Sequence, residues 1–280
     1  MTSRDLQHAL NDGTTLPAIG LGTVGLRGED GITAMLSALQ AGYRLLDTAV
    51  NYENEAEVGE AIRRSGLARK EIVVATKIPG RHHEHDLAIG SVEDSLNRLD
   101  LDYIDLVHIH WPNPSVGKYR EAWRALVALR ERGIVRSIGV SNFTKEHLAD
   151  ITDDTGVTPA INQIEMHPYF PQHEMRQVHQ DLGIVTEAWS PLGKRSAPFD
   201  AEPVVAAAQA HDVTPAQAIL RWHLQLGSLP IPKSATPERQ IQNLDVFGFA
   251  LSDDEVAAIS ALAQPDGRLF GGDPNTHEEM

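Results

Sequence analysis

The feature that most constrains the fold is an alternation of short apolar runs with amphipathic stretches from Ile19 to Ala263. Apolar residues recur at helical spacing between the runs, for example at Ile89, Val92 and Leu96. Repeated strand-then-helix units require parallel strands covered by helices, and eight units can close into a barrel. The pattern therefore predicts a (β/α)8 TIM barrel of the α/β class. Its expected strands are Ile19–Thr23, Tyr43–Asp47, Ile72–Lys77, Tyr103–His110, Arg136–Ser141, Ala160–Glu165, Ile184–Ser190 and Leu229–Pro232.

Both ends of the chain lie outside this alternation. Asn11-Asp12-Gly13 separates two short extended runs and predicts an N-terminal β-hairpin. From Pro265 onward, glycines and prolines break the helical pattern and predict an irregular C-terminal tail. Because no linker or low-complexity segment interrupts the chain, we expect residues 1–280 to form a single barrel domain, a fold that typically needs about 250 residues.

Composition limits the class of partner. The formal net charge of −15 argues against nucleic acid and anionic membrane surfaces, which are themselves polyanionic. The absence of cysteine excludes disulfides, zinc–thiolate sites and thiol nucleophiles. The first eight residues have no apolar core like that of a signal peptide, and no apolar run approaches the roughly 20 residues that span a bilayer. We therefore expect a cytoplasmic protein that acts on a small molecule.

Four ionisable residues, Asp47, Tyr52, Lys77 and His110, lie at or just past the ends of three successive expected strands. The C-terminal ends of barrel strands meet at one mouth, where such barrels carry their chemistry. A free phenol has a pKa near ~10, and an adjacent ammonium held by a carboxylate lowers it. Tyr52 is thus expected to donate a proton to a carbonyl oxygen, with Lys77 and Asp47 as its activating pair. The alternative is an ordinary barrel ion pair beside a surface tyrosine.

The segment from Gly42 to Gly59 resembles the first signature of the aldo-keto reductases at each fixed position. Three further blocks resemble the same family in the same order: Ala75–Lys77, His108–Pro112 and Ile231–Arg239. Four ordered matches are far more specific than one short motif. The resemblance implies a monomeric enzyme that uses NADPH/NADP+ to reduce an aldehyde or ketone carbonyl. It also implies that His110 orients the carbonyl.

The same resemblance implies how the nicotinamide would be held. Ser141, Asn142 and Gln163 would hydrogen-bond its carboxamide, and Trp189 would stack on its ring. Tryptophan at that position is similar to the bacterial branch that includes the 2,5-diketo-D-gluconate reductases. The residues from Ser190 to Gly193 would line the pyrophosphate.

The 2′-phosphate would bind where Lys233, Ser234 and Arg239 surround a helix start expected to be capped by Thr236. Gln242 and Asn243 would approach the adenine, although the family commonly has glutamate where this chain has Gln242. The full set of expected cofactor contacts is Gly22, Thr23, Val24, Asp47, Ser141, Asn142, Gln163, Trp189, Ser190, Pro191, Leu192, Gly193, Ile231, Lys233, Ser234, Ala235, Arg239, Gln242 and Asn243.

The resemblance places Val24, Tyr52, His110 and Trp111 around the substrate, but it does not identify the carbonyl compound. In the family a tail of this kind folds over the barrel mouth, so Leu269 and Phe270, its only large apolar residues, are expected to contact the pocket. The alternative for the tail is a frayed terminus.

Three other hypotheses compete. Gly20–Gly25 matches a dinucleotide-binding fingerprint, but the residues after Gly25 do not start a helix directly, so we expect a strand end and a turn. His108 and His110 have the i, i+2 spacing of metal ligands in barrel hydrolases, but the other strand ends offer few further ligands, so no metal is expected. A barrel that binds NADPH only as a sensor is the non-enzymatic alternative.

Overall fold

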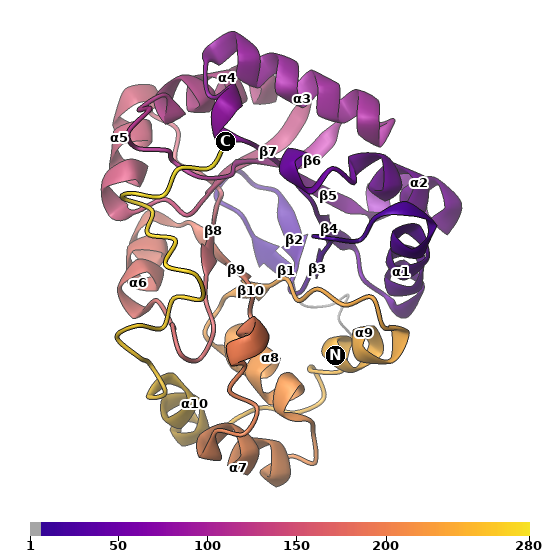
Figure 1. The fold of residues 1–280 in the computed structure, drawn as a ribbon, viewed down its shortest axis with the longest axis vertical. Coiled ribbons are helices and arrows are strands. Elements are labelled where there is room, and N and C mark those ends of the chain that lie inside the picture. Colours follow the sequence, from indigo (N-terminus) through magenta and orange to yellow (C-terminus); the bar gives the residue numbers. More distant parts are fainter. Residues whose placement is uncertain (1–6) are drawn as a thin grey trace.

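The computed structural model describes residues 7–280 as eight parallel strands surrounded by helices (Figure 1). The strands follow one another in the sheet in chain order, as repeated strand–helix units require. Their bounds are β3 (Leu21–Gly22), β4 (Leu45–Asp47), β5 (Val73–Ile78), β6 (Ile104–Ile109), β7 (Val135–Ser141), β8 (Ile161–Glu165), β9 (Val185–Trp189) and β10 (Leu229–Pro230). Each overlaps the strand expected from the sequence, so the predicted α/β barrel class is confirmed.

Two backbone hydrogen bonds bring the ends of the sheet together. The Gly20 N–H donates to the carbonyl of Pro230 at 3.1 Å, and the Gly22 N–H donates to the carbonyl of Pro232 at 3.3 Å. These bonds join the segment of β3 to that of β10. The sheet thereby curls back on itself, and the C-terminal ends of all eight strands face the same mouth.

Helices follow the strands in turn and cover the outside of the sheet (Figure 1). Helices α7 and α10 are additional to one helix per strand: α7 precedes α8 in the connection after β9, and α10 follows α9. Trp222 of α8 and Ile259 of α10 belong to the apolar cluster that α7 also joins. The helix bounds are α1 (Gly28–Ala41), α2 (Glu55–Ser65), α3 (His85–Leu99), α4 (Tyr119–Glu131), α5 (Lys145–Thr155), α6 (His173–Leu182), α7 (Glu202–Ala210), α8 (Pro215–Gln225), α9 (Pro237–Leu244) and α10 (Asp253–Ser260).

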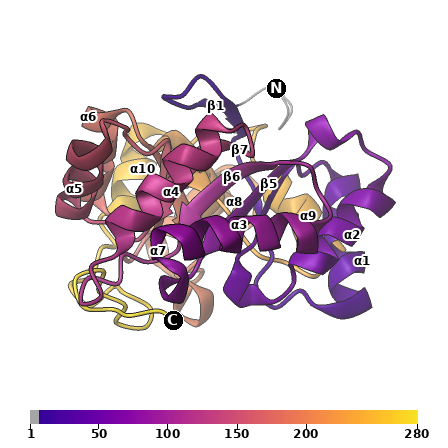
Figure 2. The same ribbon diagram turned by 90° about the horizontal axis from the view of Figure 1, so that it is seen from above.

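The expected N-terminal hairpin is confirmed and covers one end of the barrel. Strands β1 (Gln7–Ala9) and β2 (Thr15–Pro17) pair in antiparallel fashion. Leu10 and Leu16 join the apolar cluster of the inward-facing strand residues. Figure 2 shows this hairpin at the opposite end of the molecule from the C-terminal tail. The other end of the barrel is thus left for the site.

Alternation along the strands separates the two faces of the sheet. On β5, Val74 and Ile78 pack in the large cluster between sheet and helices, whereas Ala75 belongs to the interior cluster. Lys77 shares the inward face with Ala75, two residues farther along, so the polar layer lies directly above the apolar one. Within residues 7–280, no helix is both long enough and apolar enough to cross a membrane.

Side-chain caps begin two of the helices, α8 and α10. The hydroxyls of Thr214 and Ser252 accept hydrogen bonds from the N–H groups of Gln217 and Glu255, three residues on. Thr236 occupies the N-cap of α9, but its side chain makes no capping bond, so that prediction is wrong. The Thr236 N–H instead donates to the Ser234 hydroxyl at 3.1 Å.

We predict opposite effects for two helical Gly→Ala substitutions. An ideal Cβ at Gly59 in α2 would lie 2.1 Å from the Leu99 carbonyl oxygen, so Gly59→Ala must separate α2 from α3. Such overpacking lowers the free energy of unfolding by about 1–3 kcal/mol. An ideal Cβ at Gly90 in α3 has no atom within 4 Å. Gly90→Ala should therefore stabilise the folded protein by up to about 1 kcal/mol, because alanine favours the helix more than glycine does. Urea midpoints test the pair, and a Gly59→Ala protein as stable as the parent contradicts this packing.

Candidate active site

A cavity of about 550 Å³ opens at the C-terminal mouth of the barrel. Its walls come from the ends of seven of the eight strands, all except β5, so residues far apart in sequence converge there. Its lining residues are Gly22, Thr23, Val24, Asp47, Tyr52, His110, Trp111, Ser141, Asn142, Gln163, Trp189, Ser190, Pro191, Leu192, Lys194, Phe199, Ile231, Pro232, Lys233, Arg239 and Phe270.

The floor of the cavity is a buried ion pair between Lys77 and Asp47. The Lys77 ammonium lies 2.6 and 2.7 Å from the two carboxylate oxygens of Asp47, and it donates a third bond to the Thr48 carbonyl at 2.9 Å. The Lys77 side chain is fully buried, and that of Asp47 is 2% exposed. Burial alone lowers the pKa of Lys77, but Asp47, Tyr52 and Glu187 outweigh it, so the pKa is raised and the ammonium keeps its charge.

Tyr52 ends a short 3-10 helix, Val50–Tyr52, that follows β4. The Lys77 Nζ atom lies 5.2 Å from the centre of its ring. Burial raises the pKa of Tyr52, and the carboxylates of Asp47 and Glu279 raise it further, whereas Lys77 lowers it. The net shift is upward, so the expectation of a lowered pKa is wrong. Tyr52 is therefore a protonated phenol at neutral pH.

His110 follows β6 and contacts Tyr52 edge to face, with ring centres 5.8 Å apart. Its Nδ1 atom lies 2.9 Å from a carboxylate oxygen of Glu279, which comes from the C-terminal tail. The two atoms do not form an aligned hydrogen bond, so this is a close polar contact. The structure thus brings together all four residues expected from the strand ends.

The amide groups of Gln163 and Asn142 have fixed orientations. The Gln163 Nε2 group donates to Asp47 and to Glu187, both at 2.9 Å. Because carboxylates only accept, the Gln163 carbonyl oxygen is left free of these two partners. The Asn142 amide donates to the His110 carbonyl and the Ser141 hydroxyl, and its oxygen accepts from the Trp189 indole at 2.8 Å. Both side chains therefore offer acceptors to the cavity.

The backbone is strained where two of the lining residues leave their strands. Asn142, after β7, has φ of 63°, and Ser190, after β9, has φ of 49°. Non-glycine residues occupy this left-handed region at a cost of order 1–3 kcal/mol, and such residues cluster at functional sites. Both turns place backbone or side-chain polar groups along the cavity wall.

Two cations, Lys233 and Arg239, line the far side of the cavity between β10 and α9. Both residues are exposed, and neither takes part in an ion pair within the described part of the chain. Two uncompensated cations on one wall are notable in a protein with a net charge of −15. Their charge and hydrogen-bond donors suit an anion.

Most of the expected cofactor and substrate residues line the cavity. Lys77 lies beneath its floor, and the remaining exceptions are Gly193, Ser234, Ala235, Gln242 and Asn243. Ser234 and Ala235 lie on the connection to α9, and Gln242 and Asn243 lie on α9 itself. Asn243 is buried beside Tyr43 rather than facing the cavity.

The tail contributes to the site, as expected from its apolar residues, but only in part. Phe270 lines the cavity and stacks on Trp189, with ring centres 5.5 Å apart and planes at 24°. Leu269 does not line it; its N–H donates to Glu165 at 2.7 Å. The tail passes over the barrel mouth in Figure 1 and is not a frayed end.

Sequence reasoning did not identify Lys194, Phe199 and Glu279 as parts of this region. The Lys194 ammonium lies 5.8 Å from the ring centres of both Trp189 and Phe270. Lys194 comes directly after the expected pyrophosphate segment, and its proximity to that segment was the one available signal. No periodic pattern marks Phe199 or Glu279, because both lie in irregular segments.

The alternative hypothesis of His108 and His110 as paired metal ligands does not match the structure. His108 is buried inside the barrel with Asp47 and Glu187, whose ligand atoms lie within 4.8 Å of one another, and His110 is not part of this group. Its Nε2 atom is 3.5 Å from Glu187. A metal ion bound by Asp47 there would also meet the Lys77 ammonium, which already occupies both carboxylate oxygens.

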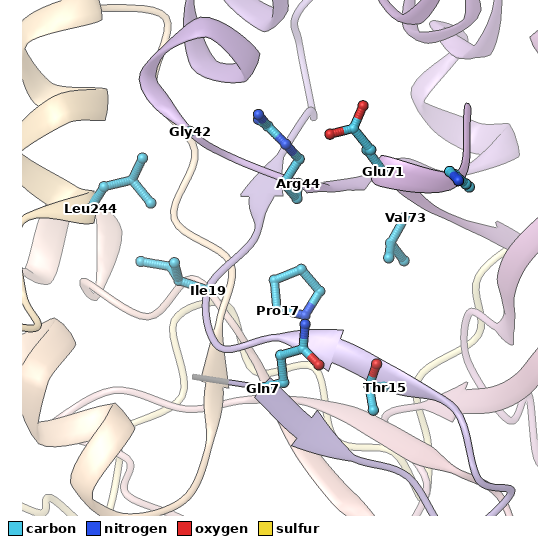
Figure 3. Close-up of a pocket in the computed structure, with 10 residues that line it drawn as sticks. Gln7, Thr15, Pro17, Ile19, Gly42, Arg44, Glu71, Val73 and Leu244 are labelled. Atoms are coloured by element: carbon cyan, nitrogen blue, oxygen red, sulfur yellow. The ribbon is translucent and has the colours of Figure 1, made fainter. Parts of the chain in front are cut away.

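A second cavity, of about 340 Å³, lies at the hairpin end of the barrel (Figure 3). Arg44 and Val73 line it at the N-terminal ends of β4 and β5, together with Gln7 and Thr15 of the hairpin. The Arg44 guanidinium donates to the carbonyls of Leu39 and Tyr43. In parallel barrels this end serves stability, which makes the other mouth the candidate for chemistry.

Comparison with known proteins agrees with this geometry. Residues 18–264 match the model of the aldo/keto reductase family. The chain is 57% identical over 272 residues to 2,5-diketo-D-gluconic acid reductase B of a Corynebacterium species, which covers 97% of this chain and 98% of that protein.

Solved structures agree as well. A Gox0644 mutant in complex with NADPH superposes with a TM-score of 0.93 at 42% identity, covering 98% of both chains. The Bombyx mori aldo-keto reductase in complex with NADP superposes with a TM-score of 0.87 at 34% identity, covering 94% of both chains. By its sequence match, its barrel and its relatives, this chain belongs to the aldo/keto reductase family.

Proposed function

We propose that the protein is an NADPH-dependent oxidoreductase that reduces an aldehyde or ketone carbonyl to an alcohol, with Tyr52 as the general acid. The observation that carries the proposal is the convergence of Tyr52, the Lys77–Asp47 pair and His110 on one cavity. NADPH, when bound, supplies the hydride. Relatives in complex with NADPH and NADP support this choice of cofactor.

The residues present fit the phosphates of this cofactor. Lys233 and Arg239 provide two cations without ion-pair partners among the described residues, which suits the additional 2′-phosphate. Gly22 permits the close approach of the segment that carries Lys233, because a Cβ there would lie 3.0 Å from the Ile231 carbonyl oxygen and 3.6 Å from the Lys233 Cβ atom. In this proposal Ser190, Pro191 and the following residues of the segment to Gly193 line the pyrophosphate.

The opposite end of the cavity fits a carboxamide. Gln163 and Asn142 present acceptor oxygens, which suit the two N–H bonds of a carboxamide nitrogen. The Ser141 hydroxyl donates to the backbone carbonyl of Gln163 at 2.8 Å and can supply a further polar contact. Phe270 covers one face of Trp189, so the nicotinamide is expected to stack on the opposite face.

Proton donation in this proposal depends on the transition state rather than on a low resting pKa. Burial keeps Tyr52 protonated, so the proton is present when the carbonyl binds. As the alkoxide develops, Tyr52 gives up its proton, and the nearby Lys77 ammonium stabilises the resulting phenolate. His110 donates to the same oxygen and orients it. Stabilisation that appears only as charge develops raises the rate of the chemical step.

The site is assembled from one chain, which supports action as a monomer of one barrel domain. Val24, 49% exposed, and Trp111, buried at the mouth, form the walls near Tyr52 in this proposal. These walls suit a small carbonyl compound. A screen of sugar keto acids, methylglyoxal, small aldehydes and ketones, followed by NADPH absorbance, tests the proposed activity and identifies the substrate.

Tyr52→Phe is expected to lower kcat by about a hundredfold to ten-thousandfold, because it removes the positioned acid. NADPH affinity should stay close to that of the parent. Tyr103→Phe is the matched control: Tyr103 precedes β6, away from the mouth, and its ring contacts Arg69 and Arg136. Steady-state kinetics decide the question, and a Tyr52→Phe enzyme within a few-fold of the parent shows that another group donates the proton.

Parent protein is expected to prefer NADPH to NADH by roughly a hundredfold, because two charge-assisted hydrogen bonds contribute at least about 1.5 kcal/mol each. Arg239→Ala should narrow that preference, because it should weaken the binding of NADPH and leave the binding of NADH unchanged. Arg132→Ala, which removes an exposed cation paired with Glu93, serves as the control. Fluorescence titrations with both cofactors measure the four affinities, and equal affinities in the parent rule out a 2′-phosphate site.

Lys77→Met is expected to abolish reduction and to destabilise the fold by about 3–5 kcal/mol, because Asp47 is left as an unpaired buried carboxylate. The double variant Asp47→Asn/Lys77→Met removes that charge as well, so it should recover much of the stability and none of the activity. Urea unfolding and kinetics on both variants separate the two roles. Recovered activity in the double variant is the result that contradicts a role for the Lys77 charge.

A further inference from the structure

The last residues of the chain return to the active site. Figure 1 shows the tail running from α10 across the molecule to the C-terminus. Glu279 brings its carboxylate to 2.9 Å from the Nδ1 atom of His110, and the Asn51 amide donates to the same carboxylate oxygen. Neither Glu279 nor Asn51 lines the cavity itself. The carboxylate therefore contacts His110 without being part of the cavity wall.

The backbone of the tail is also held at the site by hydrogen bonds. The Asn113 amide donates to the Glu279 carbonyl at 2.5 Å, and the Glu279 N–H donates back to Asn113 at 3.3 Å. The tail also lies so close to Gly80 that an ideal Cβ there would be 2.1 Å from the Glu279 carbonyl oxygen and 2.0 Å from the Asn113 amide nitrogen. Gly80 is thus needed for this approach.

The two nitrogens of the His110 ring have different surroundings. The Nδ1 atom is buried and faces Glu279. The ring lines the cavity, and within residues 7–280 its Nε2 atom has no hydrogen-bond partner. A carboxylate on one nitrogen of an imidazole fixes the ring orientation and directs the other nitrogen outward. Nε2 is consequently the nitrogen directed at a bound carbonyl, and it donates to that oxygen when both ring nitrogens carry a proton, the form in which Nδ1–H also faces the Glu279 carboxylate.

We propose that Glu279 is a positioning residue for His110, so the C-terminal tail completes the catalytic site instead of only covering it. This inference rests on the proposed function, in which His110 orients the carbonyl. Glu279 touches no substrate in this account and acts through the His110 ring. Removal of its carboxylate should therefore slow the chemical step while leaving substrate binding nearly unchanged.

The charge state of Glu279 is consistent with this role. Burial opposes its ionisation, but the contact with His110, the Asn51 amide and the Gly80 N–H outweigh burial and hold the pKa of Glu279 below its usual range. The group is thus a carboxylate at neutral pH. Its neighbour Glu278 accepts instead from the Ser115 N–H at 2.8 Å.

The first test compares Glu279→Gln with Glu278→Gln, two identical chemical changes one residue apart. Glu279→Gln should lower kcat by roughly ten- to a hundredfold, the effect of a misplaced catalytic group, with the KM for the aldehyde within about twofold of the parent. NADPH deuterated at C4 should show a larger isotope effect on kcat in that variant. Glu278→Gln should match the parent in each measurement.

The second test moves the tail without altering Glu279. Gly80→Ala must displace Glu279 and Asn113, so it should reproduce the loss in kcat. Long-range proton–nitrogen spectra provide a readout independent of turnover. The His110 signals, assigned by their loss in His110→Asn, should show a protonated Nδ1 in the parent and a changed Nδ1 signal in Glu279→Gln and Gly80→Ala.

The inference is overturned by a kcat within about twofold of the parent in Glu279→Gln, by a change in KM alone, or by an equal loss in Glu278→Gln. Its failure is distinct from failure of the proposed function. If the parent reduces carbonyls and Tyr52→Phe does not, while Glu279→Gln behaves as the parent, only the role of Glu279 is wrong. A parent without NADPH oxidation contradicts the proposed function itself.

Discussion

The buried ion pair between Lys77 and Asp47 is the interaction on which the rest of the site depends. Two charges removed from water are tolerated only when they are paired and hydrogen-bonded, so β4 and β5 must keep their register at this layer of the barrel. Gln163 extends the same network from β8 to Asp47 and to Glu187 of β9. A perturbation at any of these strand ends therefore reaches the electrostatic environment of Tyr52.

The order of layers in the barrel explains why this network can exist. The hairpin closes one end with apolar residues, and the interior cluster fills the space above it. The polar layer then lies between that apolar floor and the open mouth, where the cavity gives access to ligands. The tail adds Phe270 and Glu279 from outside the repeated units, so the mouth is shaped by the least regular part of the chain.

Much of this arrangement was predictable from the sequence, for physical reasons. Alternating apolar periods located all eight strands, and parallel strand ends must converge, so Asp47, Lys77 and His110 had to meet. The upward pKa shift of Tyr52 was not predictable, because it depends on burial and on the Glu279 carboxylate. Glu279 itself lies in a segment without periodicity, so only the folded tail reveals its partner.

The central claim is that the cavity at the C-terminal mouth carries out direct hydride transfer to a carbonyl carbon. The most direct measurement uses NADPH carrying deuterium at both C4 positions of the nicotinamide, with the product alcohol analysed by NMR and mass spectrometry. This account predicts one deuterium per product molecule on the carbinol carbon, because the hydride passes directly while the oxygen receives its proton from Tyr52. Product formed without deuterium on that carbon contradicts it.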